Sequence, residues 1–172
     1  MMRIMRLVLF MALTALLAGC GSSGGVAGSS VEPGPGADPV PTKATVTIGT
    51  QAASAATVIY GVEFILHLPA GVTVPADPAT GDVQPGLLRF ANSGAFAGAK
   101  YLPATATARA SVKMVIADTG GFTVGDLATL TCSVSPGVTV SAAEFSLDEF
   151  IAIDADTAVM PGITPHFTVQ TQ

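Results

Sequence analysis

The chain has 172 residues, of which 49% are hydrophobic and 11% are charged, and its formal net charge is −5. A chain of this length and hydrophobicity can bury one sizeable core. Its acidic balance leaves no basic patch for a phosphate backbone, which excludes nucleic acid as a partner.

The N-terminal segment has the pattern of a secretory signal. Arg3 and Arg6 precede the apolar run LVLFMALTALL, which extends from Leu7 to Leu17. Roughly 20 apolar residues are needed to cross a bilayer as a helix. This run is too short for that, but it matches the apolar core of a signal peptide.

The run ends in Leu17-Ala18-Gly19-Cys20, which resembles the lipobox of bacterial lipoproteins. The resemblance implies that residues 1–19 form a helical signal peptide that is removed, and that Cys20 carries acyl chains such as palmitate. Several acyl chains make a stable membrane anchor. Gly21 stands where an aspartate would favour the inner membrane in enteric bacteria, so we expect the outer membrane of the cell envelope. The alternative is an ordinary secretory signal with a chance cysteine.

Residues 20–42 are predicted to be a flexible linker. The stretch after Cys20, GSSGGVAGSSVEPGPGADPVP, is rich in Gly, Ser and Pro and nearly free of bulky apolar side chains. A flexible chain of this length spans roughly 25 Å. We therefore expect the folded domain, residues 43–172, to be held about that far from the membrane.

From Lys43 onward, apolar residues recur at every second position, which is typical of β-strands. In VIYGVEFILHL, one face is expected to be apolar: Val58, Tyr60, Val62, Phe64, Leu66 and Leu68. Further strands are predicted at 45–48, 87–91, 108–117, 127–134, 137–142, 148–153 and 166–171, with turns such as Gly120-Gly121 between them. In two of these strands the residues expected to face inward are Ala110, Val112, Met114, Ile116, Ala128, Leu130, Cys132 and Val134. Many short strands without an amphipathic helix predict an all-β sandwich or barrel.

Few residues in the sequence could carry chemistry. His67 and His166 are the only two histidines and lie far apart along the chain. No serine stands in a G-x-S-x-G elbow, and no glycine loop could hold a phosphate. The sequence therefore predicts a protein that is not an enzyme and that needs no cofactor.

One thiol could act as a nucleophile, and one acidic pair could bind a metal ion. Cys132 falls on the apolar face of its strand, which favours a buried, inert thiol. It has no disulfide partner if Cys20 is lipidated. Asp154 and Asp156 are weak candidates for a metal site, because carboxylate oxygens suit hard cations. Their spacing lacks the central glycine of a calcium loop, so no metal is expected.

Three segments of the domain resemble cohesin domains. They are YGVEFILHLPAGVTV (60–74), GFTVGDLATLTCSV (121–134), in which Gly125 and Leu127 would be the characteristic pair, and FIAIDADT (150–157). The resemblance implies a nine-stranded sandwich with jelly-roll topology, shared with some carbohydrate-binding modules. It also implies a protein partner such as a dockerin, bound through one sheet face.

The expected function is a non-catalytic module for protein interaction, or a structural role, at the cell envelope. Arg109, Ser111 and Lys113 point outward from their predicted strand and are candidates for the partner-binding face. The alternative is a carbohydrate-binding module. The chain has no Trp and two Tyr, and Tyr101, in a stretch predicted to be a loop, would be the sugar contact.

Overall fold

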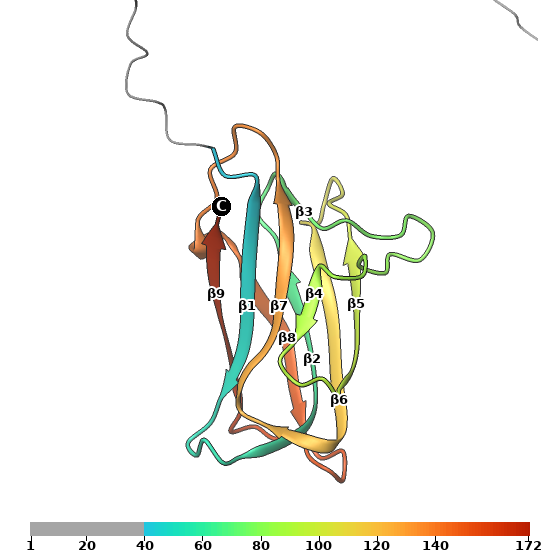
Figure 1. The fold of residues 1–172 in the computed structure, drawn as a ribbon, viewed down its shortest axis with the longest axis vertical. Helices are drawn as coiled ribbons and strands as arrows, with labels where there is room; N and C mark the ends of the chain where they lie inside the picture. Colours follow the sequence, from blue (N-terminus) through green and yellow to red (C-terminus); the bar gives the residue numbers. More distant parts are fainter. Residues whose placement is uncertain (1–39) are drawn as a thin grey trace, which may run out of the picture. The chain divides into compact units, whose positions relative to one another are not determined.

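A computed structural model describes residues 40–172, and in these residues the chain is all-β (Figure 1). The predicted signal helix and most of the predicted linker lie outside the described residues. The elements are β1 (Lys43–Gln51), β2 (Val58–His67), β3 (Val72–Thr73), β4 (Leu88–Phe90), β5 (Phe96–Leu102), β6 (Ser111–Thr123), β7 (Gly125–Val134), a 3-10 turn (Ala142–Glu144), β8 (Ser146–Ile153) and β9 (Thr164–Thr171). In the described part of the chain, no helix is long and apolar enough to cross a membrane.

The strands form two antiparallel sheets that pack face to face. One sheet has the order β3-β7-β1-β9, with β4 also paired to β7, and the other has the order β5-β6-β2-β8. In Figure 1 the first sheet lies in front of the second. Within the described residues, the chain stays in one sheet at the β3–β4 and β5–β6 connections and crosses between sheets at the others. The predicted two-sheet sandwich with jelly-roll crossings is confirmed.

The core lies between the two sheets and is built by the alternation of each strand. The inward residues Ala110, Val112, Met114 and Ile116 near and in β6, and Ala128, Leu130, Cys132 and Val134 in β7, are all buried. These residues were predicted to face inward, and the prediction is confirmed. Phe64 of β2 lies at the centre of this layer, with its ring centroid 6.5 Å from that of Phe150 in β8.

A register shift in β2 corrects the predicted apolar face. Pairing between β2 and β6 is irregular between Ile59 and Gly61, where β6 contributes the extra residues Asp118–Gly121. The shift turns Ile59 into the core, while Val58 is exposed and Tyr60 is half-buried. A bulge reverses which residues face inward on one side of it, so the simple alternation over the whole strand was wrong at these two positions.

Two other local predictions were wrong. The stretch around Tyr101, predicted to be a loop, forms β5 at the edge of its sheet. Its inward face consists of Ala97, Ala99 and Tyr101, and two of these three are alanines, which are depleted in strands and give a weak strand signal. Residues 137–142, predicted to be a strand, are instead a loop that leads into a 3-10 turn, where Ser141 and Glu144 form a capping box.

The Gly120-Gly121 turn was also misplaced. β6 continues through both glycines to Thr123, and the chain turns at Val124 instead. Gly121 has φ of 72°, and a Cβ at this position would lie 2.6 Å from Val58. Gly121 therefore allows β6 to approach β2 closely within the bulge, and it does not form a turn between strands.

Candidate interaction surface

The outward face of the sheet β5-β6-β2-β8 carries apolar and charged side chains in regular rows. Strand pairing aligns four rows across it: Phe96, Ala117, Gly61 and Ile153; Gly98, Val115, Glu63 and Ile151; Lys100, Lys113, Ile65 and Asp148; and Leu102, Ser111, His67 and Ser146. We call these sixteen residues the four-row face. Four of its apolar side chains are more than a third exposed: Phe96 (75%), Leu102 (51%), Ile151 (45%) and Val115 (37%).

The outward face of the other sheet is chemically different. It presents mainly hydroxyl and amide side chains: Thr73, Thr45, Thr47, Thr129, Thr131, Ser133, Thr168 and Gln170. Its charged groups are Lys43, Arg89 and, at one end, the pair of His166 and Asp126, and we call it the hydroxyl-rich face. None of the large exposed hydrophobic residues in the described part of the chain lies on this face. Of the two sheet faces, only the four-row face has the exposed apolar area that marks interaction sites.

The charges of the four-row face are partly paired within the chain. Lys113 Nζ lies 2.5 Å from Glu63 Oε1, and this hydrogen bond raises the pKa of Lys113 above its usual value. His67 Nε2 lies 3.9 Å from Asp148 Oδ2. Both pairs are at least partly open to solvent, so they contribute little to stability. Lys100 is next to Asp82 in an isolated backbone bridge at the β5 edge, but it forms no ion pair with a described acidic side chain.

The three residues proposed for a binding face have different surroundings. Lys113 is exposed on the four-row face. Ser111 also points to this side of the sheet, where it pairs with Leu102 of β5 and with His67 of β2. It is only 7% exposed. Arg109 lies before β6 begins, and its guanidinium donates a hydrogen bond to the backbone carbonyl of Glu144. The three residues therefore do not form one continuous exposed stripe.

Tyr101 lies on the inward side of β5, opposite Val112 of β6. Its ring is half-buried against the core, and burial raises the pKa of the Tyr101 hydroxyl. A sugar ring stacks on an exposed aromatic face, and Tyr101 does not present one. Phe96, at the other end of β5, is the exposed aromatic residue of this strand.

The acidic pair after β8 organises a turn. Asp154 Oδ1 accepts hydrogen bonds from the backbone N–H groups of Asp156 and Ala158, at 2.9 Å each. One carboxylate oxygen is therefore already engaged by the backbone. No group of three or more His, Cys, Asp or Glu side chains that could hold a metal ion occurs among residues 40–172. The two histidines lie on different sheets, His67 on β2 and His166 on β9.

Cys132 is buried in the core, as predicted, and burial raises the pKa of its thiol to about 12. At neutral pH the reactive thiolate is therefore almost absent. We expect N-ethylmaleimide to leave Cys132 unmodified in the folded protein and to modify it fully in guanidinium chloride. Mass spectrometry of the two samples measures the difference. Rapid modification of the folded chain at pH 7 would contradict the burial of this side chain.

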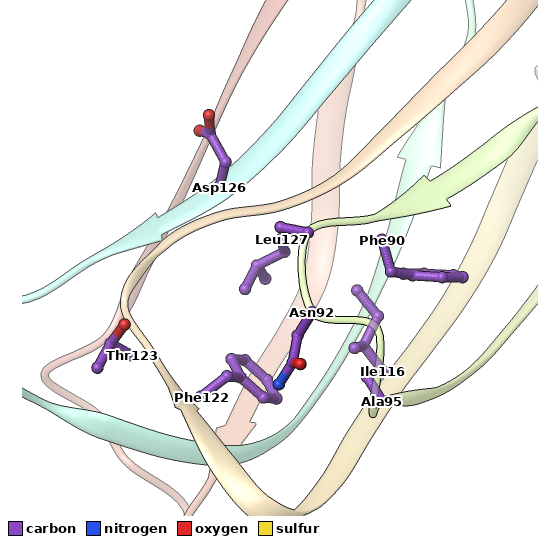
Figure 2. Close-up of a pocket in the computed structure, with 9 residues that line it drawn as sticks. Phe90, Asn92, Ala95, Ile116, Phe122, Thr123, Asp126 and Leu127 are labelled. Atoms are coloured by element: carbon purple, nitrogen blue, oxygen red, sulfur yellow. The ribbon is translucent and has the colours of Figure 1, made fainter.

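A cavity of about 310 Å³ opens beside the β6–β7 turn (Figure 2). Phe90, Ile116, Phe122 and Leu127 form its apolar wall. Asn92 donates a hydrogen bond to Asp118 (2.6 Å) and accepts one from Gly94 N–H, so its amide is already occupied. Figure 2 shows the Asp126 carboxylate directed away from Phe122 and Asn92. The polar groups therefore do not converge on a common point, as they would in a ligand site.

Comparison with known proteins adds no relative: no family model, no curated protein and no solved structure matches the chain.

Proposed function

We propose that this chain is a lipid-anchored, non-catalytic module of the bacterial cell envelope that binds another protein through the four-row face. The observation that carries the proposal is the contrast between the two sheet faces. One presents Phe96, Ile151 and Val115 among charged side chains, and the other is hydroxyl-rich. Exposed apolar side chains within a polar surround are the composition of a protein interface.

The resemblance of three segments to cohesin domains supports the same proposal, because such domains bind a protein partner through one sheet face. The nine strands of the described chain equal the number which that resemblance implies. The lipobox-like sequence ending at Cys20 supports a position at the membrane. A flexible tether there would raise the effective concentration of the module toward partners on the same membrane.

The test places a photo-cross-linking amino acid at one position of each sheet face. At position 96, in place of the exposed Phe96, we expect protein adducts when cells are irradiated. At position 168, in place of Thr168 on the hydroxyl-rich face, we expect none. Absence of adducts at position 96, or equal adducts at both positions, would contradict the proposal. Retention of the chain on insoluble polysaccharide that Tyr101→Ala abolishes would favour the carbohydrate-binding alternative.

A further inference from the structure

We propose that the protein bound by the four-row face is a second copy of this chain, related by a twofold axis that runs along the strands between β6 and β2. This inference rests on the proposed function, because it names the partner of the same face. Such an axis places β5 of one copy over β8 of the other, and β6 over β2. Each row of the face then meets the same row of the second copy in reverse order.

Charge complementarity is the first argument for this arrangement. Lys100 on β5 and Asp148 on β8 stand in the same row, at opposite edges of the sheet. Both side chains are exposed. Lys100 forms no ion pair with a described acidic side chain, although Asp82 is its neighbour in an isolated backbone bridge, and Asp148 has only the contact of 3.9 Å with His67. The twofold axis brings Lys100 of each copy opposite Asp148 of the other. Two complementary contacts therefore form in each dimer, and such contacts select orientation.

Apolar complementarity is the second argument. In the first row, Phe96 at the β5 edge meets Ile153 at the β8 edge of the other copy. Next to Ile153 lies a shallow depression of about 130 Å³ lined by Gly61, Val115 and Ile151, among others. The most exposed aromatic side chain of the face is therefore placed at a concave apolar site. Aromatic anchors that enter such sites supply much of the affinity of protein interfaces.

The centre of the face also satisfies its charges in this arrangement. Glu63 and Lys113 flank the axis and already form an ion pair within each copy. Two such pairs meet at the centre of the dimer, so no charge is buried without a partner. An unpaired buried charge would oppose association strongly, whereas a paired one does not.

The direction of the strands distinguishes this axis from the perpendicular one. Rotation about an axis along the strands leaves the strand direction unchanged, so β1 begins at the same end of both copies. Two chains anchored through Cys20 can therefore lie in one membrane. An axis across the strands would stack β5 on β5 and set the two β1 ends on opposite sides. It would place Lys100 of one copy over Gly98 of the other, far from Asp148.

The size of the face indicates a weak dimer. Four strands and four rows cover about 19 Å by about 27 Å, or about 500 Å². A standard interface buries about 800 Å² per partner. We therefore expect association to be weak in dilute solution and favoured on a membrane, where the tethers hold the copies at high effective concentration.

The first experiment uses a zero-length carbodiimide cross-linker on the full lipidated chain in vesicles, followed by peptide mass spectrometry. Within one copy, Lys100 and Asp148 are three strand spacings apart, about 14 Å, which is beyond the reach of a direct amide bond. A Lys100–Asp148 cross-link therefore has to join two copies. The Lys113–Glu63 pair reacts within one chain and serves as the internal positive control.

The second experiment exchanges the charges. Lys100→Asp and Asp148→Lys each create two like-charge contacts, and each variant is expected to weaken dimerisation about tenfold or more. The double variant restores both contacts with reversed sign and is expected to dimerise as the unmodified chain does. An equimolar mixture of the single variants is expected to form the mixed dimer. Arg89→Asp, on the hydroxyl-rich face, is the matched control and should have no effect.

The outcomes separate this inference from the proposed function. Dimers cross-linked at Lys100–Asp148 and rescued by the double variant support the inference. A chain that stays monomeric in vesicles, or dimers that the double variant does not rescue, overturn it. If position 96 then still gives adducts in cells whose mass is not that of two chains, the proposed function stands with a different partner. If position 96 gives no adducts, the proposed function fails as well.

Discussion

Replacing Cys20 with alanine is expected to move the protein almost completely from the membrane fraction to the soluble fraction. The expectation follows from the lipobox-like sequence Leu17–Cys20, in which the thiol of Cys20 would carry the lipid. Several acyl chains anchor a protein stably to a bilayer, and the domain that remains without them carries no acyl chain to insert. Cell fractionation and immunoblotting measure the distribution.

Cys132→Ala is the matched control for this experiment, because it removes the other cysteine of the chain, which is buried in the core. It should leave the protein in the membrane fraction. Mass spectrometry of the purified protein gives an independent reading. The expected mass is that of residues 20–172 plus acyl chains. An unmodified Cys20, or a chain that retains residues 1–19, would show that the anchor prediction is wrong.

Phe64→Ala is expected to reduce the free energy of unfolding by about 3–5 kcal/mol, because it removes a fully buried aromatic side chain and leaves a cavity. Phe64 is 0% exposed and lies beside Phe150 between the two sheets. A loss of this size is a large fraction of the roughly 5–15 kcal/mol that stabilises a typical domain. Chemical denaturation followed by circular dichroism measures the change.

The chain contains a matched control for this substitution as well. Phe96→Ala makes the same chemical change at a side chain that is 75% exposed. Most of this ring is already in contact with solvent, so the substitution removes little buried apolar surface. The free energy of unfolding is therefore expected to change by no more than about 0.5 kcal/mol. If the two variants unfold at the same denaturant concentration, then Phe64 is not in the core and the assignment of faces in β2 is wrong.

The sequence by itself determined the class of the fold and much of its core. Alternation of apolar residues in β6 and β7 identified Met114, Leu130 and Cys132 as inward-facing, and all three are buried. This works because side chains of a strand alternate between two faces, and a sheet with one buried face has to place its apolar residues on that side. The class of the fold follows from the number of such strands and the lack of amphipathic helices.

The tertiary structure decided the features that depend on pairing. Tyr60 was assigned to the core by alternation, but the bulge opposite Asp118–Gly121 turns it away. Tyr101 was assigned to a loop, but pairing with β6 makes its segment an edge strand. Bulges and edge strands arise from the partner strand rather than from the pattern of one segment, so periodicity within the segment does not reveal them.

The candidate site depended on tertiary structure most of all. Lys113 and Ser111 were recognised as outward-facing, but the apolar side chains beside them were not. The sequence signal for these apolar side chains was that Val115 and Ile151 occupy outward positions in the alternation of their strands. Lys100 and Asp148 share a row at opposite edges of one face because of the order β5-β6-β2-β8, in which β2 pairs with β6 and β8, two strands that are distant from it in the sequence. Local sequence patterns determine which side of a strand is apolar, whereas strand order and register, set by packing of the whole core, determine which side chains share a surface.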